Sequence, residues 1–294
     1  MASDVLAVIL NWNCAEQTLR CLRAVRAGEV VPEVLLVDNG STDDSLSTMD
    51  GQAPVLALEH NLGYAGGMNA GIRVAAQRGI DRVWLLNADC VPAPGALSTQ
   101  LGYADQFAVS VPAQVASADP ADPQPQPYLV AAMLPKGKVA PVICPGCPAG
   151  AHEVDVVTGT GLLLRVDWAT RVGLFDERFF HYKEEFDLVR RITLAGGRAG
   201  LVCAARVWHQ RGGSLALSSP RALYYHHRNE VLYVRKHYPH PVRRLLREPV
   251  HYKNLATLAL GLLAGARPRR LRSLAGLAGY RDGLRGVHGP IERF

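Results

Sequence analysis

Four short apolar runs alternate with segments of helical character in the first ninety residues, and this alternation limits the fold more than any other feature. The runs are "VLAVIL" (5–10), "EVLLVD" (33–38), "PVLALE" (54–59) and "RVWLLN" (82–87). Uninterrupted apolar runs are typical of strands covered on both faces, and the segments between them space apolar residues for one face of a helix. Repeated strand, helix and strand predict an α/β chain with a mostly parallel central sheet flanked by helices.

Polar side chains follow each of these runs, namely Asn11; Asp38 and Asn39; Asn61; and Asn87 and Asp89. Because the carboxyl ends of parallel strands share one edge of a sheet, we expect these side chains to converge on one binding crevice. A lone carboxylate such as Asp89 is a weak metal signal, since Mg²⁺ and Mn²⁺ also take phosphate oxygens and waters. Turn and cap chemistry alone would account for the group around Asp38.

The rest of the chain changes in composition along its length. Residues 111–152 are rich in Pro, Ala and Gly, which predicts an irregular insertion over the site. Strand and helix patterns return over 153–215, including "EEFDLVRRITLAGG", where Asp187 is spaced to pair with Arg191. We therefore expect a main domain over 1–215, whose first part is 1–110, and a helical, basic extension over 216–294.

Three acids, Glu184, Glu185 and Asp187, crowd the first turn of the helix predicted at "EEFDLVRR". The helix dipole favours anions there, but three carboxylates are more than a cap requires. We expect at least one of them to act as a base.

Charge and cysteine content bear on the possible ligands and partners of the chain. Lys and Arg exceed Asp and Glu by 32 to 26, and much of the excess follows residue 205. Such a basic tail suits nucleic acid, a phosphorylated ligand or an anionic membrane, and the charge does not choose among them. Of these three, we expect no nucleic-acid partner. Six scattered cysteines do not form a disulfide framework, and the lone pair Cys144 and Cys147 favours a turn over a zinc site.

The two ends of the chain bear on localisation. The start, "MASDVLAVIL", has no secretory signal pattern, so we expect a cytoplasmic protein. "NLATLALGLLAGA" is shorter than the ~20 residues of a membrane span. It leaves open either a core helix or a segment in peripheral contact with the inner face of the membrane.

A string of motifs carries a family resemblance over about residues 5–238. They are "VILNWN", "LLVDNGSTDDS", "HNLGYAGGMNAGI", "WLLNADC", "TGTGLLLR", "VGLFDERFFHYKEEFDLVRRITLAGGR", "VWHQRGG" and "YYHHRNEVLYVRKH". The chain resembles the family 2 glycosyltransferases, within them the bacterial rhamnosyltransferase-like and galactofuranosyltransferase-like enzymes. The resemblance implies the GT-A (nucleotide-diphosphosugar transferase) fold, Rossmann-like, with 1–110 as the nucleotide-sugar-binding half and 153–215 as the acceptor and catalytic half.

The resemblance also implies roles for the donor side of the site. The residues implied in nucleotide-sugar binding are Asn11, Asp38, Asn39, Asn61, Gly63, Gly66, Gly67, Asn87 and Asp89. Among them, Asp38 and Asn39 match the position that holds the nucleotide base. Asp89 matches the last aspartate of a DXD-like motif, and Asn87 stands where its first acid would be. Asp89 and His209 would together hold a divalent metal ion, Mn²⁺ or Mg²⁺.

On the acceptor side, Glu185 matches the catalytic base of the family, in the neighbourhood of Glu184 and Asp187. Because "EEFDL" replaces the usual "EDxDL", Glu184 competes with Glu185 for this role. The resemblance thus implies an inverting, metal-dependent transfer of a sugar from a nucleoside diphosphate donor to an acceptor hydroxyl, with a deoxysugar such as rhamnose favoured.

The acceptor is left open among a small molecule, a glycan and a lipid-linked molecule, and so is a homodimer through the C-terminal segment. Two other functions stay in view. One is a non-catalytic nucleotide-sugar-binding partner subunit. The other is a sugar nucleotidyltransferase, which "NWNCAEQT" disfavours because it lacks a Gly-rich loop with a basic residue after the first strand.

Overall fold

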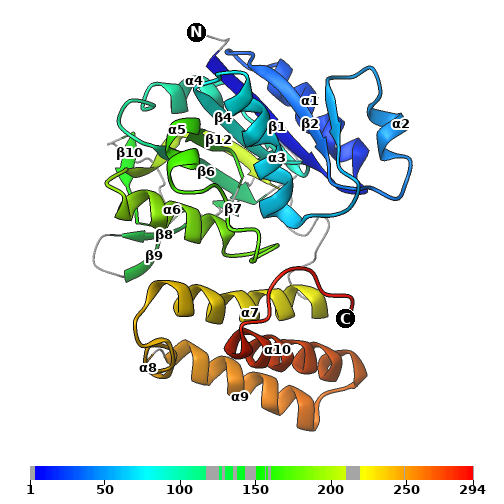
Figure 1. The fold of residues 1–294 in the computed structure, drawn as a ribbon, viewed down its shortest axis with the longest axis vertical. Helices are drawn as coiled ribbons and strands as arrows, with labels where there is room; N and C mark the ends of the chain where they lie inside the picture. The colour runs from blue at the N-terminus through cyan, green and yellow to red at the C-terminus, as the bar shows by residue number, and fades with distance from the viewer. Residues whose placement is uncertain are drawn as a thin grey trace. The chain divides into compact units, whose positions relative to one another are not determined.

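The computed structural model describes residues 4–116, 126–127, 130–134, 138–142, 150–155, 157, 160–209, 219–247 and 249–293 (Figure 1). It divides into two compact units. Met1–Asp176 and Glu185–Ser214 form the first, here called the sheet unit, and Glu177–Glu184 and Leu215–Phe294 form the second, here called the helical unit. Cys144 and Cys147 lie outside the described residues.

Ten of the described strands form one sheet, in the order β10-β12-β6-β11-β4-β1-β2-β3, with β5 beside β12 and β7 beside β6. Their bounds are β1 Val5–Asn11, β2 Glu33–Asp38, β3 Val55–Ala57, β4 Arg82–Asn87, β5 Cys90–Pro92, β6 Val109–Ala116, β7 Gln126–Pro127, β10 Ala151–Glu153, β11 Leu162–Arg165 and β12 Ala199–His209. β1 pairs in parallel with both β2 and β4, and β2 with β3, as the alternating sequence pattern predicts. β11 runs antiparallel to β4 and β6, so the sheet is mixed.

Two apolar cores cover the two faces of this sheet, because alternate side chains of a strand point to opposite faces. Leu6 and Val8 of β1 pack with α3, α5 and α6 on one face, and Val5, Ala7 and Ile9 pack with α1, α2 and α4 on the other. The helices of the sheet unit are α1 Ala15–Arg26, α2 Ser45–Met49, α3 Gly63–Gln77, α4 Ala96–Leu101, α5 Val166–Arg171 and α6 Glu184–Leu194, the last beginning at the boundary between the units (Figure 1).

The Pro-rich insertion contains more regular structure than its composition predicts. β8 (Val130–Leu134) and β9 (Lys138–Val142) form an antiparallel pair, a two-stranded sheet of their own. The prediction of an irregular connection is therefore wrong for these ten residues. Their apolar, partly β-branched sequences suit strands, and the Pro and Gly that dominate the average lie mostly in the flanking residues.

The helical unit is built from α7 (Pro220–His237), α8 (Pro241–Arg247), α9 (Pro249–Ala264) and α10 (Arg267–Arg285). α7 and α10 pack closely because α10 presents glycines to α7: a Cβ on Gly279 would lie 2.4 Å from the carbonyl oxygen of Tyr224, and one on Gly283 would lie 2.7 Å from that of Arg228. Asp282 of α10 accepts a hydrogen bond from the Tyr224 hydroxyl at 2.8 Å. None of the described helices is both long enough and apolar enough to cross a membrane.

Candidate active site

Two residues 120 positions apart in sequence meet at the carboxyl edge of the sheet. Asp89 follows β4, and the antiparallel pairing of β5 with β12 sets His209 opposite Cys90, the neighbour of Asp89. The Nε2 atom of His209 lies 3.1 Å from Oδ1 of Asp89, and their side chains are only 16% and 10% exposed. The structure thus brings together the two residues implied in metal binding.

The Asp89 and His209 pair has the chemistry and spacing of two neighbouring ligands of a divalent cation. Ligands at ~2.1 Å from a metal ion and at right angles to each other stand ~3 Å apart. Among the described residues, no third His, Cys, Asp or Glu joins this pair. Oδ1 of the neighbouring Asn87 is buried and has no hydrogen-bond partner within the described chain. A cation held here would therefore take its other ligands from substrate oxygens and water.

Buried and partly buried thiols lie near this edge of the sheet. Burial raises the pKa of Cys14, and the carboxylates of Asp89 and Asp43 raise it further. The Cys14 thiol lies 3.6 Å from Oδ1 of Asn11. The pKa of Cys21 is raised well above its usual value by the contact with the Cys90 thiol, 3.7 Å away, and by burial.

Asp38 is the centre of a buried hydrogen-bond network where β1 and β2 end. Its Oδ1 accepts bonds from Nδ2 of Asn11 (2.7 Å) and from the Ser41 hydroxyl (2.6 Å), and its Oδ2 accepts the Ser41 backbone N–H (3.0 Å). Thr18 of α1 donates to Oδ1 of Asn11 at 2.7 Å. Asn11 and Asp38 are 0% and 1% exposed, so the structure shows them holding the ends of β1 and β2 together, and direct contact with a nucleotide stays a prediction.

Asn39 and Asn61 clasp the end of β2 to the start of α3. Asn39 donates from Nδ2 to the side-chain oxygen of Asn61 (3.1 Å) and to the Gly63 carbonyl (3.0 Å), and its Oδ1 accepts the Leu62 N–H (2.9 Å). Gly63 itself needs a glycine because its φ is +71°. These residues fix the loop that follows β3.

Gly66 and Gly67 also have packing roles. A Cβ on Gly66 would lie 2.4 Å from Cβ of Leu62, and one on Gly67 would lie 2.4 Å from Cδ1 of Leu10. Close packing of the first turns of α3 therefore accounts for both glycines without a ligand.

The three acids of α6 have different surroundings. Glu184 is 2% exposed, whereas Glu185 is half-buried and keeps some access to solvent. Asp187 is fully buried and forms the predicted ion pair with Arg191, at 2.7 Å. Arg191 also donates to the carbonyl oxygens of Val172 and Leu174, so this pair holds the chain that precedes α6.

The site contains supporting residues that the sequence analysis did not single out. Thr160, buried before β11, accepts the backbone N–H of Asn87 at 2.8 Å. Asn69 of α3 exchanges two hydrogen bonds of 2.9 Å with the backbone of Phe175. A lone polar residue within a helix or loop is a weak sequence signal, since only the fold shows which backbone groups it satisfies.

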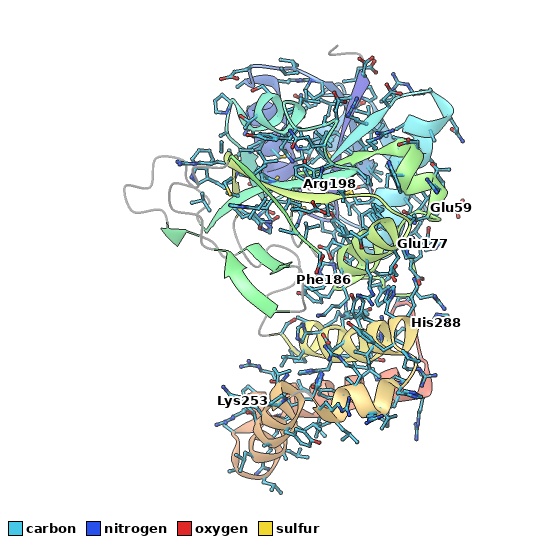
Figure 2. All side chains as sticks on the ribbon, turned by 90° about the vertical axis from the view of Figure 1, so that its left-hand side faces the viewer. Glu59, Glu177, Phe186, Arg198, Lys253 and His288 are labelled. Carbon is cyan, nitrogen blue, oxygen red and sulfur yellow. The ribbon has the colours of Figure 1, made fainter. Side chains whose placement is uncertain are left out.

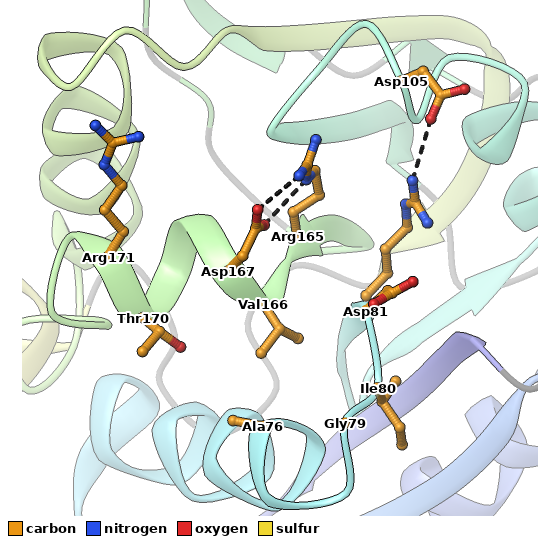
Figure 3. A pocket seen from close by; sticks show the side chains of 11 residues that line it. Ala76, Gly79, Ile80, Asp81, Asp105, Arg165, Val166, Asp167, Thr170 and Arg171 are labelled. Carbon is orange, nitrogen blue, oxygen red and sulfur yellow. Dashed lines mark hydrogen bonds and ion pairs between the residues drawn. The ribbon is translucent and has the colours of Figure 1, made fainter.

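A hollow of about 770 Å³ lies at the opposite edge of the sheet, where β4 begins and β11 ends (Figure 3). Four of its charged residues form two pairs: Arg165 with Asp167 at 2.6 Å and Arg82 with Asp105 at 3.4 Å. It is remote along the strands from the polar carboxyl edge, and nothing in its lining indicates a reaction.

Comparison with solved structures defines the class of fold. The chain superposes on GalNAc-T7, solved with UDP, GalNAc and Mn²⁺, with a TM-score of 0.62 and 16% identity, covering 96% of this chain and 56% of that one. It superposes on the mannosyltransferase PcManGT from Pyrobaculum calidifontis, solved with GDP-Man and Mn²⁺, with a TM-score of 0.59 and 16% identity, covering 96% and 87%. The fold is therefore that of the GT-A glycosyltransferases, as predicted.

The sequence places the chain more narrowly. The model of "Glycosyl transferase family 2" matches residues 7–154, and the protein belongs to this family of transferases. The chain is 27% identical over 267 residues to an N-acetylglucosaminyl-diphospho-decaprenol L-rhamnosyltransferase of Mycobacterium tuberculosis, covering 79% of this chain and 84% of the relative. It is 28% identical over 219 residues to the galactofuranosyltransferase GlfT1 of Mycolicibacterium smegmatis, covering 71% of each. The predicted resemblance is confirmed.

Proposed function

We propose that the protein is an inverting glycosyltransferase that uses a divalent metal ion to move a sugar from a nucleoside diphosphate donor to an acceptor hydroxyl. The observation that carries this proposal is the approach of His209 to Asp89 at the polar edge of a GT-A sheet. The name of the L-rhamnosyltransferase relative supports rhamnose as the transferred sugar. We take dTDP-rhamnose as the first donor to test and UDP sugars as the next.

On the donor side, the chain's own residues would position the leaving group. Asp89 and His209 would hold Mn²⁺ or Mg²⁺, which when bound supplies positive charge against the departing diphosphate. The unpartnered Oδ1 of Asn87 is available to a donor hydroxyl or a bound water. The hydrogen-bonded pair Asn39 and Asn61 would border the nucleotide, where main-chain and amide groups select the nucleotide base.

On the acceptor side, Glu185 would remove the hydroxyl proton as the acceptor oxygen attacks the sugar carbon. The bond from that carbon to the diphosphate oxygen breaks as the new glycosidic bond forms, which inverts the anomeric configuration. The partial exposure of Glu185 supports its assignment over the buried Glu184. Asp187 would orient α6 through Arg191 and take no proton.

Two matched substitutions test the base. Donor turnover is measured as dTDP release from dTDP-rhamnose with Mn²⁺, and donor binding as the thermal shift given by dTDP. Glu185→Gln should lower kcat by ~10²–10⁴-fold with binding unchanged. Glu184→Gln is the control, since it changes the neighbouring carboxylate in the same way. A fully active Glu185→Gln protein beside an inactive Glu184→Gln protein would move the base to Glu184.

The metal is tested by binding alone. Asp89→Ala and His209→Ala should each abolish the Mn²⁺-dependent part of the dTDP thermal shift. Substitution of Asp43, an exposed acid near the same edge, is the control and should leave it intact. If dTDP or UDP binds equally well in the presence of a chelator, the proposed metal dependence is wrong. If the donor binds but is never consumed, with or without acceptors, a non-catalytic nucleotide-sugar-binding subunit replaces the enzyme.

The helical unit carries a surface suited to an anionic membrane. Large apolar side chains of α8, α9 and α10 are exposed, among them Leu260 at 60% and Leu263 at 76%. The same three helices also carry exposed basic residues: Arg243, Arg247, Lys253, Arg267, Arg269, Arg270 and Arg272; Lys253 is labelled on α9 in Figure 2. Apolar residues flanked by Arg and Lys are typical of helices that lie at a lipid interface.

This surface, and the lipid-linked acceptor in the name of the rhamnosyltransferase relative, support a polyprenyl-linked acceptor and peripheral membrane contact. The protein should sediment with phosphatidylglycerol vesicles and less with phosphatidylcholine vesicles. The double substitution Leu260→Ser and Leu263→Ser should weaken sedimentation, whereas Leu194→Ser, an exposed leucine of α6, should not. If the double substitution instead converts a dimer to a monomer in light scattering, α9 is a dimer interface.

A further inference from the structure

The segment Glu177–Glu184, which leads into the proposed base, belongs to the helical unit although it interrupts the sheet unit in sequence. Figure 2 labels its first residue, Glu177, and also Phe186, which lies two residues beyond its end. Here we call this segment the base-leading loop. Its last residue, Glu184, is bonded directly to Glu185, so the backbone path of this loop sets where the carboxylate of residue 185 begins.

The base-leading loop has an unfavourable backbone. Phe180, Tyr182 and Lys183 have φ values of +66°, +71° and +74°, in the left-handed region that non-glycine residues rarely occupy. Two hydrogen bonds lie within the loop itself, from the N–H of Phe180 to the Glu177 carbonyl (3.1 Å) and from that of His181 to the Phe179 carbonyl (2.8 Å). Left-handed conformations of this kind persist when the surrounding structure holds them.

One side chain of α7 provides much of that support. Asn229 is fully buried, and its Nδ2 donates to the carbonyl oxygens of Phe179 (2.8 Å), His181 (2.7 Å) and Tyr182 (2.8 Å). Two N–H bonds thus serve three carbonyl groups of one short loop. The helix itself does not need these side-chain hydrogen bonds, because its backbone N–H and C=O groups are already paired with each other.

The neighbour of Asn229 fixes the orientation of this amide. Arg228, also fully buried, donates from Nε to Oδ1 of Asn229 (2.9 Å), which turns the Nδ2 group toward the loop, and from Nη2 to the Phe179 carbonyl (2.9 Å). Next along α7, Glu230 pairs with Lys183 at 2.5 Å. One turn earlier, Tyr225 stacks on Phe180 with ring centroids 5.3 Å apart.

We infer that Asn229 is a positioning residue for the sugar transfer, which acts by holding the base-leading loop in the one backbone conformation that delivers Glu185 to the acceptor. This inference rests on the proposed function, in which Glu185 is the base. It assigns a role to "HHRNE" of α7. Arg228 and Glu230 serve the same loop through the amide and through Lys183.

The test uses Asn229→Asp, which keeps the shape of the side chain and replaces its N–H donors by an oxygen facing three carbonyl oxygens. The control is Tyr280→Phe, which removes another buried hydrogen bond of the helical unit, to His251 at 3.3 Å, without touching the loop. Backbone amide exchange is measured at residues 178–186, and turnover of dTDP-rhamnose with Mn²⁺ gives kcat and KM.

In the Asn229→Asp protein, the amides of Phe180 and His181 should exchange at least ~10-fold faster, because local opening becomes easier. The kcat should fall by ~10²-fold with KM for the donor within twofold, as for a displaced catalytic group. Tyr280→Phe, even if it lowers Tm as much, should change neither quantity. Unchanged exchange in the loop, or faster exchange with normal kcat, would overturn the positioning role.

The two proposals fail separately. If Glu185→Gln keeps wild-type kcat, the assignment of the base is wrong whatever Asn229→Asp does. If Glu185→Gln is inactive but Asn229→Asp loses activity only in proportion to its loss of Tm, as Tyr280→Phe does, the base stands and Asn229 is a structural residue alone.

Discussion

His227 of α7 makes the helical unit sensitive to acid. Its side chain is 6% exposed and stacks on the Tyr280 ring, with centroids 4.6 Å apart and planes inclined by 22°. Burial, followed by the charge of the adjacent His226, lowers the pKa of His227 from 6.5 to about 4, although Glu230 acts in the opposite direction. The folded protein therefore keeps this imidazole neutral at pH values where the unfolded chain protonates it.

The sign and size of the effect follow from proton linkage. Between pH 6.5 and pH 4 the unfolded state binds more protons than the folded state, so the free energy of unfolding falls as the pH falls. Above pH 6.5 the contribution of His227 is fully present. One pKa unit corresponds to about 1.4 kcal/mol, so the loss reaches about 2 kcal/mol at pH 5 and about 3 kcal/mol near pH 4.

The assay compares urea unfolding of the wild type and His227→Phe at pH 7.5, 6.0 and 5.0, followed by circular dichroism. Phenylalanine keeps the aromatic stack but does not titrate. Its extra volume costs about 1–3 kcal/mol at every pH, since a Cβ on Gly276 would already lie 3.1 Å from the His227 ring. The measured quantity is therefore the difference between the two proteins as the pH changes.

Other acid-sensitive groups are common to both proteins and cancel. The pKa values of Glu230 and Asp282 are lowered because neighbouring cations outweigh burial, which opposes the shift, so both carboxylates also lose stabilising contacts on acidification. We expect the wild type to lose about 2 kcal/mol more than His227→Phe between pH 7.5 and 5.0. Parallel pH profiles for the two proteins would refute the argument that burial of His227 sets this sensitivity.

Three further substitutions probe the packing and the crevice. Gly279→Ala should destabilise the helical unit by about 1–3 kcal/mol, because its Cβ meets the Tyr224 backbone; an unchanged Tm would show that α7 and α10 are not in close contact. Asn69→Leu should cost about 2–4 kcal/mol in urea unfolding, by leaving both backbone groups of Phe175 unpaired, and a cost near zero would contradict those bonds. Asp38→Asn should weaken dTDP binding at least ~10-fold in calorimetry while the protein stays folded. An unchanged affinity would show that the hydrogen bonds of Asp38 do not support nucleotide binding.

The strands and their polar ends could be predicted because both signals are local. An apolar run that stops at Asn11, Asp38 or Asn87 shows a buried strand and its carboxyl end within a few residues. The pairing of Asp187 with Arg191 follows from helical spacing alone. The encounter of Asp89 with His209 followed from the family resemblance and not from periodicity. Its structural cause, the three-residue strand β5, is too short to leave a pattern.

The hydrogen-bonding role of α7 could not be predicted in this way. "YYHHRNEVLYVRKH" has the pattern of an aromatic and basic helix, and nothing in this sequence distinguishes Tyr224, Arg228 and Asn229 from its other residues. The structure shows all three buried. Tyr224 donates to Asp282, and Arg228 and Asn229 donate to the base-leading loop, some fifty residues earlier in the chain. No local signal distinguishes an asparagine that binds a ligand from one that binds distant carbonyl groups.

The two halves of the proposed chemistry thus depend on different kinds of support. Asn87 ends β4, and its backbone N–H is bonded to the Thr160 hydroxyl, whereas the neighbouring Asp89 contacts His209. Glu185 is the second residue of α6 and follows a loop with three left-handed residues, three of whose carbonyl groups accept hydrogen bonds from Asn229. In the proposed mechanism, Asn229 of α7 therefore stabilises the backbone conformation from which Glu185 projects.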